Sequence, residues 1–227
     1  MATATTLDIV GHRGLQVPNR LLRPHAAIDH LVLLLPGYGY TCDMPLFYYA
    51  ENRALEVGAD VLRVEYAYSR MPDYAVAPEP EQRRWLLTDA ESAMGAALAE
   101  HPYRGVTLVG KSLGTAAVAH LLADGPAAPA SRSAAWLTPM LAEATVRDGL
   151  LAFAGPSLVV IGTADPHHDP ALLADLAARP GTDAVVVDGA DHGLDIPDDP
   201  VASVQALGRY VAALVRFLPP HDGSALA

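Results

Sequence analysis

Residues 106–117 read Val-Thr-Leu-Val-Gly-Lys-Ser-Leu-Gly-Thr-Ala-Ala, so a run suited to a buried strand enters Gly-x-Ser-x-Gly and small helix-forming residues follow at once. A strand, a sharp turn and a helix in this order, here called the elbow, present a serine hydroxyl above a sheet. Gly110 and Gly114 fit this geometry, because a side chain would crowd the tight turn or the close packing of helix on strand. The pattern predicts that Ser112 is a nucleophile; the alternative is an ordinary turn whose serine caps the helix.

The composition indicates a folded chain with one core. Of the 227 residues, 51% are hydrophobic and 18% are charged, which is typical of a globular protein and not of a disordered one. A chain of this length can form a single α/β unit. We therefore expect one domain over residues 1–227, with residues 219–227 a flexible tail after the last helix.

Charge and hydropathy exclude several classes of protein. A net charge of −11, without any cluster of basic residues, argues against a nucleic-acid binder. The longest apolar runs, such as Leu31–Leu35, are too short to span a bilayer, and residues 1–10 do not resemble a secretory signal. The single cysteine, Cys42, excludes an internal disulfide framework and is expected to be a buried thiol. We expect a cytoplasmic enzyme, whose oligomeric state the sequence does not indicate.

Apolar runs and helical patterns alternate along the chain. Besides the run before Ser112, strands are expected at Leu31–Leu35, Ala59–Tyr66, Ala134–Leu137, Ser157–Ile161 and Thr182–Val187. Helices are expected at Met44–Val57, Glu81–His101, Ala142–Phe153 and Ala171–Ala178. This alternation predicts an α/β fold, a doubly wound and mostly parallel sheet with helices on both faces.

The two ends of the chain carry more specific expectations. Two edge strands are expected between Thr6 and Arg23, separated by a turn at Pro18 and Asn19. The last helix is expected to dock on the sheet through a stripe of apolar residues: Val201, Val204, Leu207, Val211, Leu214 and Leu218. In the long helix before the elbow, four residues could face the sheet: Trp85, Ala90, Met94 and Ala97.

Three polar residues each follow a predicted strand, at the edge of the sheet where ligands bind in such folds: Ser112, Asp165 and His192. A histidine within hydrogen-bond reach can take the proton of a serine hydroxyl during attack. A carboxylate can then fix the tautomer of that histidine and stabilise its charged form. These residues are therefore the predicted catalytic triad. Three other loop aspartates stay open as the acid: Asp169, Asp188 and Asp191.

At these residues the chain resembles a known family. Gly110–Gly114, Gly162–Asp165 and Asp191–Gly193 look like the three signature segments of the α/β-hydrolase superfamily. The resemblance extends from the Leu31 strand to the last helix, and is to compact members similar to the dienelactone hydrolases, which lack a large lid domain. It implies the α/β-hydrolase fold with a minimal cap, since only one short helical segment separates the strands near Leu137 and Leu158.

The loop after the Leu31 strand is expected to complete the site. In this fold the oxyanion is held by the backbone N–H after the nucleophile, here Leu113, and by a second N–H from an earlier loop. For the second donor we expect Tyr38, with Gly37 and Gly39 as alternatives. Tyr40 and Met44 are candidates to bind the substrate; loop and helix-cap roles are the alternative for both.

A metal site is the rival interpretation of the polar loops. Asp165, His167, His168 and Asp169, with Asp191 and His192, are residue types that bind zinc or manganese. The histidines are adjacent instead of three or four residues apart, and the elbow already explains the group. We therefore expect no metal and no other cofactor, with His167 and His168 at the rim of the site or in solvent. Lys111 is expected to be a surface or structural cation.

These residues predict a serine hydrolase that cleaves an ester, thioester or related acyl bond of a small molecule. A non-hydrolytic enzyme on the same scaffold, such as an acyltransferase, a lyase or a cyclase, is the first alternative. A binding module that retains the triad without using it is the second.

Overall fold

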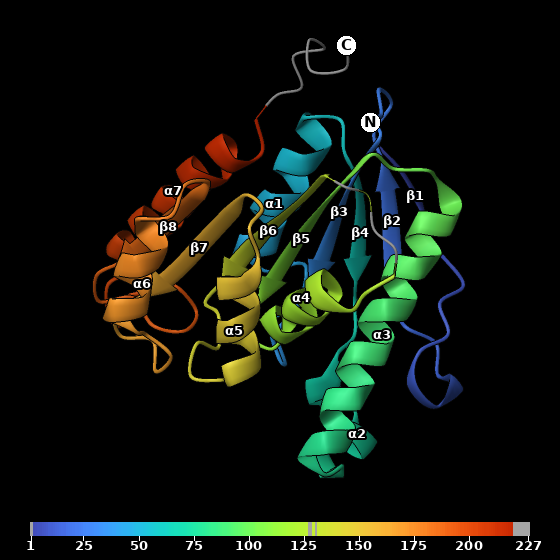
Figure 1. The fold of residues 1–227 in the computed structure, drawn as a ribbon, viewed down its shortest axis with the longest axis horizontal. Helices are drawn as coiled ribbons and strands as arrows, with labels where there is room; N and C mark the ends of the chain where they lie inside the picture. Colours follow the sequence, from blue (N-terminus) through green and yellow to red (C-terminus); the bar gives the residue numbers. More distant parts are fainter. Residues whose placement is uncertain (1, 127–128, 130, 220–227) are drawn as a thin grey trace.

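The architecture is one twisted sheet between two layers of helices (Figure 1). The computed structural model describes residues 2–126, 129 and 131–219. Within them, eight strands form a sheet in the order β1-β2-β4-β3-β5-β6-β7-β8. Their bounds are β1 (Thr3–Thr5), β2 (Asn19–Arg23), β3 (His30–Leu35), β4 (Asp60–Val64), β5 (Gly105–Lys111), β6 (Ser131–Leu137), β7 (Ser157–Gly162) and β8 (Thr182–Val187).

Most of the sheet is parallel. The strands β3 to β8 pair in parallel, whereas β2 runs antiparallel to β4, and β1 to β2. Leu35 of β3 pairs with Gly110 of β5, so these two neighbouring strands reach the same edge of the sheet together. The predicted doubly wound, mostly parallel sheet is confirmed.

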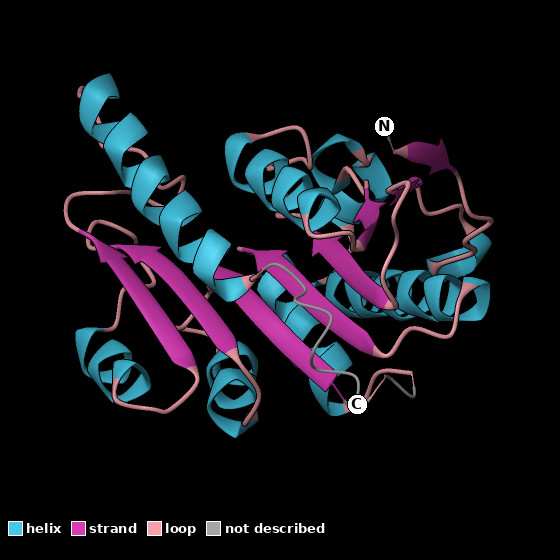
Figure 2. Cartoon of the chain, turned by 90° about the horizontal axis from the view of Figure 1, so that it is seen from above, coloured by secondary structure: helices cyan, strands magenta, loops and turns pink. Residues whose placement is uncertain are grey.

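Helices cover both faces (Figure 2). One apolar cluster packs α3, α4, α5 and α6 on one face, and a second packs α1 and α7 on the other. The helices are α1 (Pro45–Glu56), α2 (Pro72–Val76), α3 (Glu79–Glu100), α4 (Gly114–Ala123), α5 (Ala144–Ala152), α6 (Pro170–Ala177) and α7 (Pro200–Phe217). The residues expected on the inner side of α3 are all buried: Trp85, Ala90, Met94 and Ala97.

The continuous apolar run of β3 follows from this two-sided cover. Leu31, Leu33 and Leu35 lie in the cluster under α3 and α4, while Val32 and Leu34 lie in the cluster under α1 and α7. All five side chains are fully buried. Burying one such side chain stabilises the fold by about 1.5–3 kcal/mol, so a polar residue on either face of β3 would be costly.

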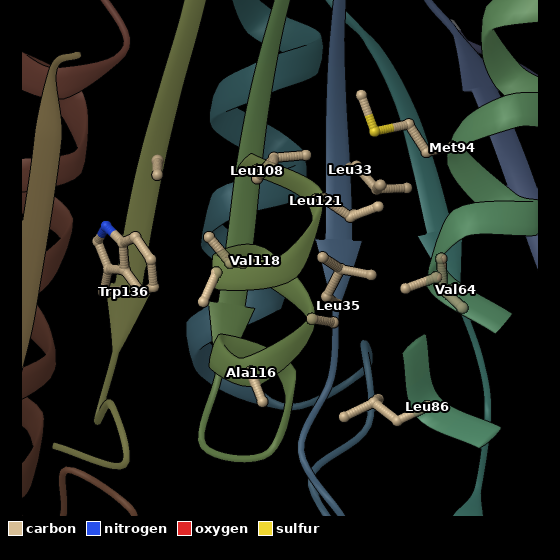
Figure 3. Packing of buried hydrophobic residues seen from close by; sticks show 14 of the residues in the cluster. Leu33, Leu35, Val64, Leu86, Met94, Leu108, Ala116, Val118, Leu121 and Trp136 are labelled. Atoms are coloured by element: carbon tan, nitrogen blue, oxygen red, sulfur yellow. The ribbon is translucent and has the colours of Figure 1, made fainter. Parts of the chain in front are cut away.

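Two glycines allow α4 to lie directly on the sheet. A Cβ atom at Gly110 would come within 2.5 Å of Val118 and 2.6 Å of the Gly114 carbonyl oxygen. A Cβ atom at Gly114 would lie only 1.9 Å from the Leu35 carbonyl oxygen. Figure 3 shows the result, with Val118 and Leu121 of α4 packed over the neighbouring strands. Because α4 lies this close to the sheet, it can begin at Gly114, two residues after Ser112.

The prediction of a turn at Pro18 and Asn19 between two edge strands is wrong. The strand β2 begins at Asn19, and the earlier strand β1 lies at residues 3–5. The buried Asn19 side chain accepts the Leu7 N–H at 2.9 Å and donates to the carbonyls of Leu7 and Val17. Asn19 thus uses its amide to replace ladder hydrogen bonds inside the sheet, a role that its turn propensity does not reveal.

The expected docking stripe of α7 is only partly correct. Leu214 and Leu218 are buried, but Val201 and Val204 are 67% and 68% exposed. The buried face of the helix also includes Ala206, Tyr210 and Ala213. Leu207 and Val211 also pack against this cluster, so four of the six expected residues face the core, and the two exposed valines lie in the first turns of α7.

Two further expectations concern the C-terminal tail and the thiol of Cys42. The expected flexible tail, residues 219–227, lies outside the described residues except for Pro219. Cys42 is 2% exposed, as expected, and burial raises the pKa of its thiol to about 12.

In the described part of the chain, none of the helices has the length and hydropathy that crossing a membrane would require.

The close contact at Gly114 generates a stability prediction. We expect Gly114→Ala to lower the free energy of unfolding by about 1–3 kcal/mol or more, because the new methyl group would overlap the Leu35 carbonyl. Urea unfolding followed by circular dichroism measures the change. The matched control is Gly208→Ala in α7, where nothing lies within 4 Å of the added Cβ. This control should stabilise the protein by about 0.5–1 kcal/mol, and equal effects of the two changes would contradict the packing described.

Candidate active site

The predicted site residues meet at the carboxyl ends of the parallel strands. Ser112 directly follows β5, Asp165 lies three residues after β7, and His192 lies five residues after β8. The chain runs from β3 outward to β4 and then returns to β5 on the other side of β3. Ligands bind at such a reversal of strand order in open α/β sheets. The arrowheads of these strands point toward one edge of the molecule in Figure 1.

Ser112 has a strained backbone. Its φ of 53° lies in the left-handed region, which costs a residue other than glycine about 1–3 kcal/mol. The turn is held by the Ser112 N–H, which donates to the Leu137 carbonyl at 3.0 Å. The Ser112 carbonyl accepts both the N–H and the hydroxyl of the buried Thr115, at 2.8 and 2.5 Å. The sequence analysis did not single out Thr115, although a threonine in the first turn of a helix is a recognisable capping signal.

Ser112, His192 and Asp165 form a continuous line of hydrogen bonds. The Ser112 Oγ lies 2.7 Å from His192 Nε2, and His192 Nδ1 lies 2.7 Å from Asp165 Oδ2. The Asp165 side chain is fully buried, whereas that of His192 is 32% exposed. This arrangement lets one imidazole nitrogen accept a proton from the serine while the other donates to the carboxylate.

Hydrogen bonds keep the Asp165 carboxylate ionised. Burial acts to raise the pKa of this carboxyl, but the hydrogen bonds from His192 and from the His167 N–H outweigh it. The pKa of Asp165 is therefore below its ordinary value. The loop that carries Asp165 is also fixed against the His192 loop, because a Cβ at Gly162 would lie 1.9 Å from the Ala190 carbonyl oxygen.

The other three candidate aspartates have local roles. Asp169 caps α6 by accepting the Leu172 N–H at 3.0 Å. Asp188 accepts the Thr163 hydroxyl at 3.0 Å, and Asp191 accepts the N–H groups of two residues that follow it. Of the four aspartates that the sequence left open, Asp165 is therefore the one placed against His192.

The predicted oxyanion donors lie beside the serine. A Cβ at Gly37 would be 3.3 Å from the Ser112 Cβ, so the loop after β3 passes close to Ser112. Within the described residues, neither Leu113 nor Tyr38 uses its backbone N–H in a hydrogen bond to another protein group. The same is true of Gly37 and Gly39. Both predicted donors, and the two alternatives in the loop, are thus free to bind a ligand.

Tyr40 and Met44 line a cavity next to the residue that follows His192. Its volume is about 210 Å³, and Gly193, directly after His192, forms part of its wall. Tyr40 is held in place because its hydroxyl accepts the Leu46 N–H at the start of α1. The cavity is lined by Tyr40, Met44, Pro45, Leu46, Gly193, Leu194, Asp195, Ser203, Val204 and Leu207. A larger cavity of about 460 Å³ lies near the amino ends of β6 and β7, and none of the predicted site residues lines it.

Two other polar residues lie deeper than a surface position. Lys111 is 4% exposed, so of its two expected roles, a surface cation or a structural one, the structural role fits. His167 lies further inside than the rim, with its ring 5.5 Å from that of His192 and its Nδ1 buried without a partner among the described residues. His168 is half-buried and its N–H donates to the Asp165 carbonyl.

Of the six residues considered as possible metal ligands, three lie close enough together to bind one ion. In the part of the chain that the structure describes, the possible ligand atoms of Asp165, His167 and His192 lie within 4.8 Å of one another. Asp165 and His192 already share a 2.7 Å hydrogen bond. A metal ion at this position would therefore compete directly with the Ser112–His192–Asp165 line.

The segment expected to form a minimal cap is the short helix α5, which packs against α4. The helix α2, which follows the short 3-10 turn Tyr68–Arg70, reaches beyond the carboxyl ends of the strands together with the adjoining end of α3 (Figure 1).

Comparisons with known proteins agree with this fold. Residues 28–217 match the family described as alpha/beta hydrolase domain. No match was found among curated proteins. The structure is similar to a dienelactone hydrolase from Anabaena variabilis, with a TM-score of 0.70 and 16% identity over 96% of this chain and 99% of that one.

Two other solved structures share the fold. A serine hydrolase without a lid from Xanthomonas campestris has a TM-score of 0.64 and 19% identity, over 97% of this chain and 96% of that one. The esterase Pf2001 from Pyrococcus furiosus has a TM-score of 0.69 and 14% identity, over 96% of this chain and 92% of that one. At these identities the likeness is one of fold.

The buried Asp165 carboxylate generates a pH-dependent prediction. Because the pKa of Asp165 is lowered in the folded protein, its stabilising effect is complete above the unfolded value of about 3.9 and is lost as the pH falls through the folded value. We expect Asp165→Asn to lower the free energy of unfolding by about 1–3 kcal/mol at pH 7 and by less at pH 3. Urea unfolding at both pH values measures this.

The control for this prediction is Asp188→Asn, which alters a carboxylate in an exposed turn. We expect its effect to stay within about 0.5 kcal/mol at either pH. A loss of stability in Asp165→Asn that is the same at pH 7 and pH 3 would contradict the assignment of an ionised, hydrogen-bonded Asp165.

Proposed function

The chain belongs to the alpha/beta hydrolase family, and on that premise we propose that it is a serine hydrolase that cleaves an ester, thioester or related acyl bond. The observation that carries the proposal is the line of two 2.7 Å hydrogen bonds from Ser112 through His192 to Asp165. The similarity in fold to an esterase and to a dienelactone hydrolase supports it.

In the first half of the reaction, the Ser112 Oγ attacks the acyl carbon and its proton passes to His192 Nε2. The carbonyl electron pair moves to oxygen, where the N–H groups of Leu113 and Tyr38 stabilise the negative charge. When the carbonyl re-forms, the bond to the leaving group breaks, and His192 gives its proton to the departing alcohol or thiol. Asp165 keeps the Nδ1 proton in place and stabilises the charged imidazole.

In the second half, water replaces the leaving group. His192 takes a proton from the water as its oxygen attacks the acyl-serine, and then returns a proton to Ser112 Oγ as the acid leaves. The 32% exposure of the His192 side chain favours this step, because an acyl-enzyme that water can reach is hydrolysed. Side chains, backbone N–H groups and water supply every step.

The substrate is a small acyl compound whose apolar part binds in the cavity of about 210 Å³ beside His192. Tyr40 and Met44 line this cavity together with Val204 and Leu207 of α7. Asp195 also lines the cavity, so a neutral acyl group is favoured over one that carries its own carboxylate. A volume of this size suits a short aliphatic chain or a single ring.

The proposed nucleophile can be tested directly. We expect a fluorophosphonate probe to label Ser112, and Ser112→Ala to abolish labelling and lower kcat by about 10⁴-fold or more. Turnover of a p-nitrophenyl ester in ¹⁸O-labelled water should place the label in the released acid, because water attacks the acyl-serine. Mass spectrometry of the labelled peptide and of the product measures both results.

Two outcomes would contradict this proposal. An adduct on Ser69 or Ser92 with Ser112 unmodified would overturn the assignment of the nucleophile. Product acid without ¹⁸O, or a product formed equally well by Ser112→Ala, would instead favour a transferase or a lyase.

The proposed cavity can be tested with two matched valines. Val204 lines the cavity and Val201, three residues earlier on α7, does not, yet their exposed fractions are 68% and 67%. We expect Val204→Glu to lower kcat/KM for a p-nitrophenyl hexanoate by about tenfold, because a carboxylate would enter an apolar wall. The acetate ester, which is too short to fill the cavity, should be affected much less.

Val201→Glu is the control, and it should leave the activity on both esters unchanged. An equal loss on acetate and hexanoate in Val204→Glu, or an equal loss in both variants, would show that the cavity does not bind the acyl chain.

A further inference from the structure

Lys111 is an unusual residue in this chain. The sequence has fifteen lysine and arginine residues together, and Lys111 is the only lysine among them. It lies between the two glycines of the elbow, directly before Ser112, and its side chain is buried. Lysine is among the residues that are least often buried, so its place inside the site requires a specific explanation.

The Lys111 side chain contacts the loops on both sides of the serine. Its Nζ donates a hydrogen bond to the His192 main-chain carbonyl at 2.9 Å. The same Nζ lies 4.9 Å from the centre of the Tyr40 ring, which is a cation–π distance. The stem passes the loop after β3, because a Cβ at Gly37 would be 3.4 Å from Lys111 Cδ.

The hydrogen bond closes a ring of contacts around the nucleophile. Lys111 is joined to Ser112 by a peptide bond, and Ser112 is joined to the His192 ring by the 2.7 Å hydrogen bond. The bond from Lys111 Nζ to the His192 carbonyl completes the circuit. His192 is thus attached at two points, through its ring and through its main chain, and its imidazole has little freedom to turn away from Ser112.

Lysine suits this position better than arginine. The contact from the side chain to the protein is one hydrogen bond to one carbonyl oxygen, with one aromatic ring beside it. A compact ammonium can make that contact, whereas a guanidinium would bring five N–H donors into a buried space. The chain uses arginine at every other basic position.

We propose that Lys111 is a positioning residue, whose ammonium ties the loop of the base His192 to the strand that carries the nucleophile Ser112. This role rests on the hydrolase reaction proposed above. Lys111 touches none of the reacting atoms; it acts through the position of His192.

The charge of Lys111 can be switched within an accessible pH range. Burial is the main cause that lowers its pKa to about 8, and the carboxylates of Asp165 and Asp191 oppose this shift. The groups that face it are Asp165 after β7, Asp191 and His192 after β8, and Tyr40 after β3. Above pH 8 the neutral amine keeps a hydrogen-bond donor but loses the charge-assisted bond and the cation–π attraction. Activity should therefore fall as the pH rises through about 8.

The kinetic test compares two variants with the wild-type enzyme between pH 6 and pH 10. We expect Lys111→Met, which removes the donor, to lower kcat by about 10²-fold while KM changes by less than about threefold, since a misplaced base slows the chemical steps. Lys111→Arg keeps a charge that does not titrate. It should recover part of kcat and should show no fall in activity near pH 8.

A measurement of thermal stability distinguishes a positioning role of Lys111 from a merely structural one. Exchange of a buried charge for an apolar side chain of similar length is often neutral or stabilising, so Lys111→Met should not lower the melting temperature. Loss of kcat without loss of stability is the expected result. Loss of both together, with the fall near pH 8 unchanged in Lys111→Arg, would overturn the proposal.

Because the chain has a single lysine, the residue can also be observed without any substrate. Protein labelled with [¹³C]lysine should give one lysine side-chain signal, with a titration midpoint near 8. A midpoint near the ordinary value of about 10.4 would show a solvated amine and overturn the proposal. Equal turnover by Lys111→Met and wild type at every pH would overturn the role of Lys111 alone, whereas no ester turnover by the wild-type protein would overturn the hydrolase function as well.

Discussion

The close approach of α4 to the ends of β3 and β5 is the constraint on which the site depends. A helix can start this near a parallel sheet only if the backbone of one element meets the backbone of the other. Gly114 meets the Leu35 carbonyl in this way, and Gly110 meets the Gly114 carbonyl. The short distance forces Ser112 into a left-handed conformation between strand and helix, and this conformation holds its hydroxyl clear of the sheet. The cost of the strained residue is offset by the buried helix behind it.

The second physical feature is a small group of buried charges with few partners. Asp165 and Lys111 are both almost completely excluded from solvent, and neither has a full ion-pair partner in the part of the chain that the structure describes. A buried carboxylate or ammonium is costly unless hydrogen bonds replace its hydration. Here the replacement comes from His192, which meets Asp165 through its ring and Lys111 through its main chain. His192 is consequently held by both charges.

The loops, more than the helices, define what the site can bind. The wall beside His192 comes from the loop after β3, the loop after β8 and the exposed start of α7. The first turns of α7 leave Val201 and Val204 exposed, whereas Ala206, Tyr210 and Ala213 further along the helix are buried, and Val204 lines the cavity. The exposed start of the helix thus supplies part of the apolar surface that we assign to the acyl group.

Features with a local cause could be predicted from the sequence alone. The strand–turn–helix around Ser112, the alternation of strands with helices and the mostly parallel sheet all follow from patterns within one turn or a few residues. The same patterns nominated His192 and four possible acids. They gave a wrong prediction at Asn19 in β2. The side-chain amide of Asn19 forms hydrogen bonds with the main chain of Leu7, and turn propensity does not describe such bonds.

Tertiary structure decided which of these residues meet. Ser112 and His192 are eighty residues apart, and their 2.7 Å contact depends on the order of the strands and on the anchoring of separate loops. The same holds for the choice of Asp165 over three other aspartates and for the inward position of Lys111. Residue type determines which chemistry a side chain can perform, but distance and burial determine its partners and its charge. Those two quantities are set by contacts between segments that are distant in the chain, and local sequence patterns do not record them.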